Sequence, residues 1–437
     1  MALATMQPWP QSSSVAAPSG AARASIDLPD QPLRVCLLSS AYPPAQIDGV
    51  GRHTYLMARG LQQHGHQVHV ITRSDQSGTE VRDGVRVHTV PSSFDHYAPY
   101  QHLPGVYHAL NYSHAVDEAV QRLMHQAGIQ IVDSPVWQIE GLVTVVSRRL
   151  PVAVRLQTAY RQTAEILKRH DTDSRLLGDL EQSLIERATH LVPNSQATVA
   201  TAQRVYHAAL KTDRYTIIPH GIEPVPDEAV RPFDPSRSAA SCTVLYVGRL
   251  EQRKGILDLF ESIPRVLKAV PGTRFVIVGA DNSRADGFLT RTGQTYPAYF
   301  ARRYAACQTH VEFTGGVSDE ILQRAYQACD LFVAPSVYES FGLIYLEAMN
   351  YAKPVIGCRA GGIPEVIDES VSGLLVDPEA PPQLAEAIIT LLRSPGKLRD
   401  FGLAARQQLL ARFTHLEMAR RFAALYRRVI AAAESTR

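Results

Sequence analysis

The sequence lacks several features that would mark whole classes of protein. No stretch of its 437 residues approaches the ~18 consecutive apolar residues of a transmembrane helix. The five cysteines are scattered, odd in number and without a C-x-x-C pair, which argues against a disulfide framework or structural zinc site and predicts a reducing, cytoplasmic location. Neither charge sign dominates, with 44 Lys plus Arg against 42 Asp plus Glu, so nucleic acid is not an expected partner.

Two common nucleotide-binding motifs are also missing. No G-x-x-x-x-G-K-[ST] loop occurs, which argues against a P-loop kinase. Gly49-Val-Gly51 has no third glycine at the right offset, and no acidic residue follows the next apolar run near Thr72. A nicotinamide-dependent dehydrogenase is therefore poorly supported.

What the sequence does contain is two series of short apolar runs separated by amphipathic stretches. The first series comprises residues 33–38, 68–71, 130–132, 152–156, 191–192 and 215–218, and the second comprises residues 243–248, 275–279, 311–313, 331–334, 354–356 and 374–376. Runs of this kind are typical of parallel strands buried on both faces. Helical stretches such as residues 54–64 and 117–126, with Gly65 and Gly128 as stops, alternate with them and predict a doubly wound α/β fold.

A proline-rich segment, residues 223–241, separates the two series and reads as an interdomain linker. We therefore predict two Rossmann-like, parallel-sheet domains, residues 31–222 and 242–410, facing a central cleft. Residues 1–30 are rich in Ala, Ser and Pro and are expected to form a disordered tail, with organelle targeting as the alternative.

The last segment, residues 411–437, is predicted to be a closing helix. Thr414 and Glu417 form a T-x-x-E capping box at its start. Its apolar face is Met418, Phe422, Leu425, Tyr426 and Val429, flanked by paired arginines. Packing of this face on the protein is favoured, and peripheral membrane attachment is the alternative.

The most informative segment holds two glutamates eight residues apart. Glu339 lies in a loop after the predicted strand 331–334, and a helix is expected to begin near Phe341 and Gly342, with Glu347 inside it. Unpaired backbone N–H groups at a helix start suit a phosphate. The spacing, about 12 Å along a helix, matches a sugar nucleotide gripped at its sugar and at its ribose. Helix capping and dipole complementarity are the alternative explanation of the two glutamates.

A second constellation follows the predicted strand 243–248. Arg249 emerges at the carboxyl end of that strand, and Lys254 stands just before the next helix. Two cations there could neutralise a departing diphosphate without a metal. If Arg249 and Lys254 bind the diphosphate, Arg253 is expected to be nearly silent in function, because it lies beside the pair without sharing its matched position. The alternative is a solvated loop in which Glu251 pairs with Arg253 and Lys254.

These residues resemble retaining glycosyltransferase family 4. Glu339-Ser-Phe-Gly-Leu with Glu347-Ala-Met matches the E-x7-E signature of that family, and Gly248-Arg-Leu with Lys254-Gly255 matches its G-R-L-x-x-x-K-G loop. Weaker matches are Gly361-Gly-Ile-Pro-Glu365, Gly373-Leu-Leu-Val-Asp377, Asp48-Gly-Val-Gly-Arg-His53 and Pro219-His-Gly-Ile-Glu223. The resemblance extends from about residue 33 to residue 429.

The resemblance implies a GT-B fold, a nucleotide-sugar donor and transfer with retention at the anomeric carbon. It implies that Glu339 contacts the donor sugar, Glu347 the ribose, and Arg249 and Lys254 the diphosphate. The backbone of Gly49 would contact the distal phosphate. The remaining donor-binding candidates are Gly248, Ser340, Phe341, Gly342 and Leu343.

The sequence departs from the family pattern after the predicted strand 152–156. Many family members carry a histidine there near the reacting sugar, whereas this chain has Gln157, or Thr158 if the alignment shifts by one residue. A glutamine can hydrogen-bond a sugar hydroxyl but cannot share a proton. Gln157 and His53 are therefore candidates for contacts with acceptor or sugar rather than catalytic groups.

Two patterns resemble metal sites without the expected surroundings. Asp171-Thr-Asp173 has the D-x-D spacing of other glycosyltransferases, but it sits in a charged stretch away from any strand end. His64, His66 and His69 bridge a helix end and the next strand, with no acid or cysteine nearby. Both are interpreted as ordinary surface or core residues, and no metal is assigned.

The sequence therefore predicts a metal-independent retaining glycosyltransferase with no cofactor beyond its substrate, a UDP-, GDP- or ADP-sugar. The acceptor would be a glycan, a lipid or a small molecule, bound mainly by the N-terminal domain. One alternative is another GT-B enzyme, a sugar-nucleotide hydrolase or epimerase. The other, motivated by Gln157, is a sugar-nucleotide-binding protein without turnover.

Overall fold

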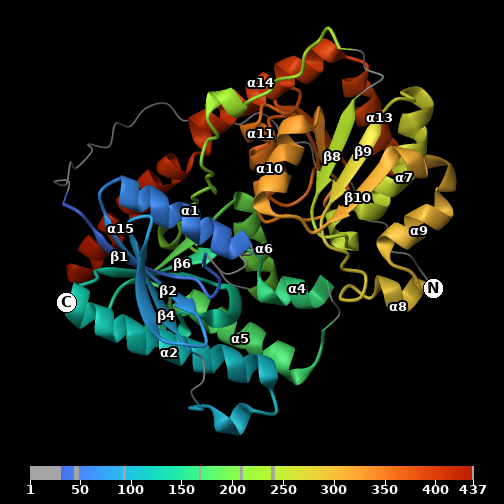
Figure 1. The fold of residues 1–437 in the computed structure, drawn as a ribbon. Coiled ribbons are helices and arrows are strands. Elements are labelled where there is room, and N and C mark those ends of the chain that lie inside the picture. Colours follow the sequence, from blue (N-terminus) through green and yellow to red (C-terminus); the bar gives the residue numbers. More distant parts are fainter. Residues whose placement is uncertain are drawn as a thin grey trace. The chain divides into compact units, whose positions relative to one another are not determined.

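The structure is a computed structural model that describes residues 31–43, 49–91, 95–166, 169–206, 210–237 and 242–435. The predicted tail, residues 1–30, and Asp48 lie outside the described residues. Two sheets, each flanked by helices, make up the chain from Leu33 onward (Figure 1). The prediction of a fold with two doubly wound α/β units is confirmed, whereas the predicted domain limits stay predictions.

The first sheet has seven strands in the order β3-β4-β2-β1-β5-β6-β7. These are β1 (Arg34–Leu38), β2 (Gln67–Arg73), β3 (Gly78–Arg82), β4 (Val85–Val90), β5 (Ile131–Pro135), β6 (Val152–Leu156) and β7 (His190–Pro193). The helices of this half are α1 (Gly49–Gln63), α2 (Pro104–Ala127), α3 (Leu142–Ser147), α4 (Tyr160–Ile166), α5 (Thr172–Arg187) and α6 (Gln196–Tyr206). Central strands such as β5 and β6 are buried along their whole length, as parallel strands covered on both faces must be.

The second sheet has six parallel strands in the order β10-β9-β8-β11-β12-β13. They are β8 (Thr243–Val247), β9 (Arg274–Val278), β10 (Val311–Gly315), β11 (Leu331–Ala334), β12 (Val355–Cys358) and β13 (Gly373–Val376). The helices around it are α7 (Ile256–Ala269), α8 (Phe288–Thr292), α9 (Tyr296–Arg303), α10 (Asp319–Ala328), α11 (Leu343–Asn350), α12 (Ile363–Val366), α13 (Pro381–Leu392) and α14 (Pro395–Arg412).

Two details of the first sheet differ from the sequence-based prediction. The predicted strand 215–218 is wrong, because that segment forms only an isolated bridge between Tyr215 and Leu191 beside β7. The sequence analysis also missed β3 and β4, an antiparallel hairpin turned at Asp83 and Gly84, both with positive φ. Strand β3 is short and exposed, so it has no continuous apolar run to reveal it.

The C-terminal helix α15 (His415–Glu434) begins as predicted, since Thr414 Oγ1 accepts a hydrogen bond from the Glu417 amide at 3.1 Å. The whole predicted apolar face is buried. It packs against α1, where a Cβ on Gly60 would approach the His415 carbonyl oxygen to 2.6 Å. The apolar face is therefore not available to a membrane, and no described helix is long and apolar enough to span one.

A buried charge network joins α15 to the first sheet. Arg155 on β6 forms an ion pair with Asp133 on β5 at 2.5 Å and donates to the Leu38 carbonyl at 2.7 Å. The Tyr426 hydroxyl of α15 donates to the other Asp133 oxygen at 2.7 Å. Burial raises the pKa of Asp133, while Arg155 and Tyr426 oppose that shift. The Asp133 carboxylate thus links β6, through Arg155, to the C-terminal helix α15, through Tyr426.

We expect Tyr426→Phe to lower the free energy of unfolding by about 1.5–3 kcal/mol, because a buried carboxylate loses its hydroxyl donor. Urea unfolding measured at neutral pH checks this. The matched control is Tyr100→Phe, an exposed tyrosine, which should change stability by less than about 0.5 kcal/mol. Equal effects of the two substitutions would contradict a role for the Tyr426–Asp133 bond.

Candidate functional site

The two segments singled out by sequence lie side by side in the second sheet. The strand order reverses between β8 and β11, because β9 and β10 extend the sheet on one side and β12 and β13 on the other. Such a reversal opens a crevice at the carboxyl ends of the two strands. Arg249 and Lys254 follow β8, and Glu339 follows β11, so the topology delivers all three to this crevice.

Lys254 and Glu339 form the central contact of this crevice. The Lys254 ammonium lies 2.5 Å from Glu339 Oε1, and Ser336 Oγ donates to the same oxygen at 3.0 Å. Only 16% of the Lys254 side chain and 13% of the Glu339 side chain are exposed. Burial alone would raise the pKa of Glu339, but Lys254, Arg253 and Ser336 together hold it below its usual value. Glu339 is therefore an ionised carboxylate.

Two glycines allow close backbone packing around the loop that carries Glu339, residues 335–342, which is called the Glu339 loop below. Gly255 has φ +68°, and a Cβ there would lie 1.8 Å from the Pro335 carbonyl oxygen. Gly361 has φ +55°, and a Cβ there would lie 2.1 Å from the Glu339 carbonyl oxygen. Side chains at either position would collide with backbone. The K-G motif (Gly255) and the G-G-I-P-E motif (Gly361) thus each pack against the backbone of this loop.

The loop after β8 has only part of the pairing that the solvated-loop alternative predicts. Glu251 is paired with Arg253 at 2.8 Å and with Arg249 at 3.5 Å, but not with Lys254, whose partner is Glu339. Arg253 also donates to the Tyr338 carbonyl at 3.0 Å and lies 3.9 Å from Glu339. Arg253 therefore supports the loop that carries Glu339, whereas the expectation that it is functionally silent stays a prediction. Arg249 is the exposed cation, with 60% of its side chain accessible.

Helix α11 begins at Leu343 with Gly342 as its N-cap, close to the predicted start. Inside it, Glu347 accepts a hydrogen bond from the Tyr326 hydroxyl at 2.8 Å. Burial raises the pKa of Glu347, and Arg52 of α1 and the Tyr326 bond oppose that shift. Arg52 also pairs with Asp319 at 3.1 Å. The first turn of α1 therefore reaches the second half of the chain through Arg52, near Glu347.

The Glu339 loop is also fastened to the first half of the chain. The Ser340 carbonyl accepts from Ser195 Oγ at 2.7 Å, and Asn194 Nδ2 lies 3.4 Å from Ser340 Oγ. Glu365 accepts from the amides of Gln196 and Ala197, which caps helix α6 from the other half. Asn194 and Ser195 were not predicted from the sequence. Asn194 and Ser195 directly follow β7, and polar residues at the carboxyl end of a strand were the available signal.

Phe341 and the predicted contact residue His53 belong to one buried cluster of aromatic rings. The His53 ring centroid lies 4.2 Å from that of His220, which in turn lies 5.1 Å from Phe341. Burial lowers the pKa of His220 to about 3 and that of His53 well below its usual value, so both rings are neutral. The Pro219-His-Gly-Ile-Glu223 motif thus joins α1 to the Glu339 loop.

Gln157 lies just beyond β6, where it lines a small internal cavity with Leu156, Ala159 and Tyr206. Its side chain is buried, and neither amide atom has a hydrogen-bond partner among the described residues. Its predicted contact with acceptor or sugar stays a prediction.

The two metal-like patterns have other roles in the structure. Asp171 caps α5 by accepting from the Ser174 amide, and Asp173 accepts from the amides of Gly105 and Val106 at the start of α2. The three histidines have separate partners: His64 faces the Leu416 carbonyl, His66 accepts from the Leu33 amide, and His69 bonds to His88.

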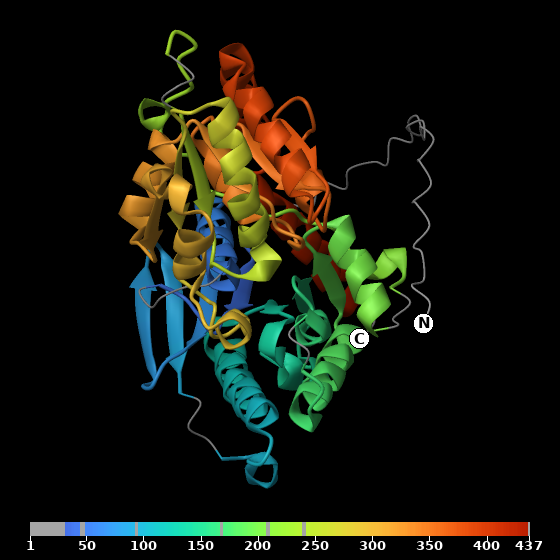
Figure 2. The same cartoon turned by 90° about the vertical axis from the view of Figure 1, so that its right-hand side faces the viewer.

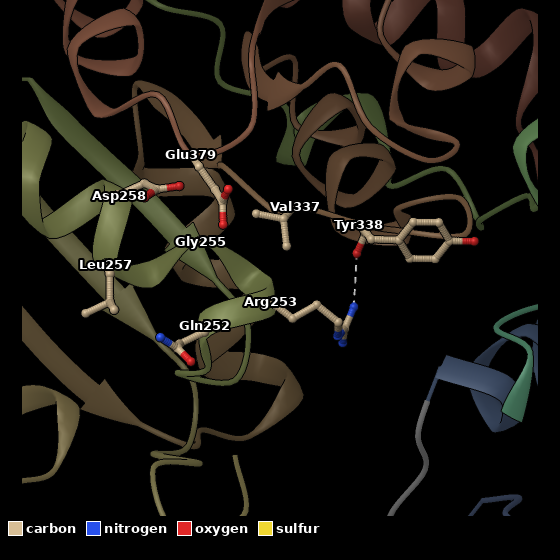
Figure 3. A pocket seen from close by; sticks show the side chains of 8 residues that line it. All are labelled: Gln252, Arg253, Gly255, Leu257, Asp258, Val337, Tyr338 and Glu379. Atoms are coloured by element: carbon tan, nitrogen blue, oxygen red, sulfur yellow. Dashed lines mark hydrogen bonds between the residues drawn. The ribbon is translucent and has the colours of Figure 1, made fainter. Parts of the chain in front are cut away.

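A pocket of about 440 Å³ borders the Glu339 loop at Val337 and Tyr338 (Figure 3). Arg253 reaches across it toward the Tyr338 carbonyl, and Asp258 and Glu379 lie at its far wall. Burial and the neighbouring carboxylates Glu379 and Glu261 raise the pKa of Asp258 to about 6. The two carboxylates make this pocket unfavourable for a diphosphate.

Comparisons with known proteins agree with this architecture. Residues 47–225 match the model of Glycosyltransferase Family 4, and residues 241–394 match that of Glycosyl transferases group 1. The chain is 27% identical over 416 residues to a glycogen synthase of Mycobacterium tuberculosis, covering 90% of this chain and 94% of that protein. It is 28% identical over 408 residues to a D-inositol 3-phosphate glycosyltransferase of Acidothermus cellulolyticus, covering 87% and 86%.

Solved structures share the fold. A sucrose-phosphate synthase from Thermosynechococcus elongatus superposes with a TM-score of 0.70 at 23% identity, covering 92% of this chain and all of that one. The Anabaena protein HepE, solved in complex with UDP and glucose, superposes with a TM-score of 0.65 at 18% identity, covering 90% and 99%.

The Lys254–Glu339 pair should be energetically coupled in the ligand-free protein. A double-mutant cycle of Lys254→Met and Glu339→Gln is expected to give a coupling of about 1–3 kcal/mol in urea unfolding at neutral pH. The exposed pair Arg265–Glu386 is the control, with an expected coupling below about 1 kcal/mol. Because the folded pKa of Glu339 is lowered, the coupling should persist above its usual pKa near 4.5 and fade as the pH falls below it. A pH-independent coupling would contradict an ionised Glu339.

Proposed function

Since the chain is a glycosyltransferase of the GT-B fold, we propose that it is a retaining enzyme of family 4 that moves a sugar from a nucleotide-diphosphate sugar to an acceptor hydroxyl. The observation that carries the proposal is the ionised Glu339 held by Lys254 at the point where the strand order reverses. An ionised carboxylate there can accept hydrogen bonds from the hydroxyls of a donor sugar.

The other predicted donor-binding residues take their roles from their places around Glu339. Glu347, one helix turn into α11, would accept from the ribose hydroxyls. Backbone amides at the start of α11 (Ser340, Phe341, Gly342 and Leu343), and those of Gly49 and Gly248, would bind the diphosphate, as helix N-termini do for anions. Arg249, which follows β8, would supply an exposed cation.

The chemistry follows from where charge develops. As the glycosidic bond breaks, negative charge grows on the leaving diphosphate, and Arg249, Lys254 and the α11 N-terminus stabilise it. The acceptor hydroxyl attacks from the same face, bonds to the anomeric carbon and passes its proton to a phosphate oxygen of the leaving group. Retention results because the bond forms on the face from which the diphosphate departs.

We propose a UDP-, GDP- or ADP-sugar as donor and a glycan, lipid or small molecule as acceptor. A glycogen synthase and an inositol phosphate glycosyltransferase among the relatives support a hydroxyl-bearing acceptor. The fold shared with a protein solved with UDP and glucose supports a nucleotide donor.

A donor panel combined with product analysis tests the function. At about 100 times its dissociation constant, the correct sugar nucleotide should add ~2.7 kcal/mol to stability in thermal-shift measurements. With an acceptor, proton NMR should show a product of the same anomeric configuration as the donor. Inversion would contradict retention. Equal release of nucleoside diphosphate without acceptor would identify a hydrolase, and donor binding without turnover a binding protein.

Glu339→Ala should abolish transfer while leaving the fold intact, because the sugar loses its carboxylate partner. Glu347→Ala should have a weaker effect, chiefly a lower donor affinity. Initial rates at varied donor concentration, with circular dichroism as a folding control, separate the two. Full activity of Glu339→Ala would remove the proposed site, and an effect of Glu347→Ala on turnover alone would reverse the two roles.

Arg249→Ala and Lys254→Ala should each lower turnover ~10²- to 10³-fold, more than they lower donor affinity, because they act on charge that develops during reaction. The double variant should be less than additive, since both cations act on one group. The control is Arg265→Ala on α7, an exposed arginine paired with Glu386, which should retain activity. A comparable loss of turnover in the Arg265→Ala variant would refute a specific role of Arg249 and Lys254 in stabilising the leaving diphosphate.

Because Arg249 and Lys254 neutralise the leaving diphosphate, a divalent ion is unnecessary for that role. Transfer should therefore continue at an unchanged rate in EDTA. Strict dependence on added Mg²⁺ or Mn²⁺ would contradict this proposal.

A further inference from the structure

Two histidines and a glutamate outside the candidate site lie close together on the first half of the chain. His114 and Glu118 are four residues apart on α2 and share one helix face, with His114 Nε2 3.8 Å from Glu118 Oε1. His96 comes from the connection between β4 and α2, and its ring centroid lies 4.0 Å from that of His114. One side-chain ligand atom from each of the three lies within 4.8 Å of the others.

His96 is held in this position by its backbone. Its amide donates to Asn111 Oδ1 at 3.0 Å, and the Asn111 Nδ2 group donates to the Tyr107 carbonyl at 3.0 Å. Asn111 is buried and lies one turn before His114 on α2. The connection is further tied to α2 by a bond of 2.9 Å from the Tyr107 hydroxyl to Asp95. The approach of His96 to His114 is therefore built into the fold.

The set of donor atoms selects the kind of ion. Two imidazole nitrogens and one carboxylate oxygen suit Zn²⁺ and its transition-metal neighbours, whereas Ca²⁺ and Mg²⁺ need more oxygen ligands. Tetrahedral zinc with bonds of about 2.1 Å places its ligand atoms about 3.4 Å apart. The separation of 3.8 Å between His114 and Glu118 needs only a small side-chain adjustment. The three side chains are at least partly exposed, which leaves room for a water as fourth ligand.

We propose that His96, His114 and Glu118 bind one Zn²⁺ ion, which cross-links the β4–α2 connection to helix α2. Figures 1 and 2, related by a turn about the vertical axis, both place the described, light-blue part of this connection (residues 95–103) at the lower end of the view, away from the second sheet. The ion therefore acts on the local structure of the first half, and transfer does not depend on it.

Zinc titration of the full-length, tag-free chain by isothermal calorimetry tests the proposal. The wild-type chain should show a Zn²⁺ site of one ion per chain, and Zn²⁺ should raise its melting temperature. His114→Ala and the isosteric Glu118→Gln should each weaken binding at this site by at least ~10-fold and lose the thermal shift. His125→Ala, an exposed histidine on the same helix, should behave as the wild type.

Melting curves of the metal-free variants establish that the substituted chains are folded. Equal zinc affinity in the wild type and in either ligand variant would overturn the site, as would the absence of zinc binding by the wild-type chain. A loss of binding in the His125→Ala variant as large as that in His114→Ala would also overturn it, because the ion would then not be held by the proposed ligands.

Discussion

The buried contact between Lys254 and Glu339 constrains the rest of the candidate site. Taking two charges out of water is costly unless each is paired and the remaining hydrogen-bonding positions are filled. Ser336 and Arg253 help to meet this demand, and Gly255 and Gly361 let the backbone of the Glu339 loop come close enough for the pair to form. The motifs around Glu339 therefore act together. The ion pair can form only because the glycines, which have no side chains, let the backbone segments come into contact.

The same loop and the nearby helix α12 carry several contacts between the two halves of the chain. The Ser340 carbonyl accepts a hydrogen bond from Ser195, the Phe341 ring packs edge to face with His220, and Glu365 caps α6. A displacement of one half relative to the other would break hydrogen bonds at the backbone next to Glu339. The position of the carboxylate is thus mechanically coupled to the first half, where the acceptor is proposed to bind. The crossing of α15 to α1 adds a second tether between the halves.

Much of the fold was predictable because parallel strands buried on both faces leave continuous apolar runs, as in residues 331–334. Strand β3 was missed because an exposed, antiparallel edge strand has no such run. The segment 215–218 was misread because an apolar run also occurs where the chain only lies along an edge without forming a ladder. The failures therefore fall at the edges of the first sheet, where burial no longer dictates composition.

By itself the sequence determined the two α/β halves, the candidate donor-site residues and the capped terminal helix, because each depends on neighbours within a few residues. Only the tertiary structure decided that Lys254 pairs with Glu339, that Arg52 of α1 lies near Glu347, and that His96 lies against His114. These pairings join segments whose separation along the chain carries no periodic signal. Which residues pair is determined by the order of the strands and by how closely the backbone segments approach, and both exist only once the sheets have formed.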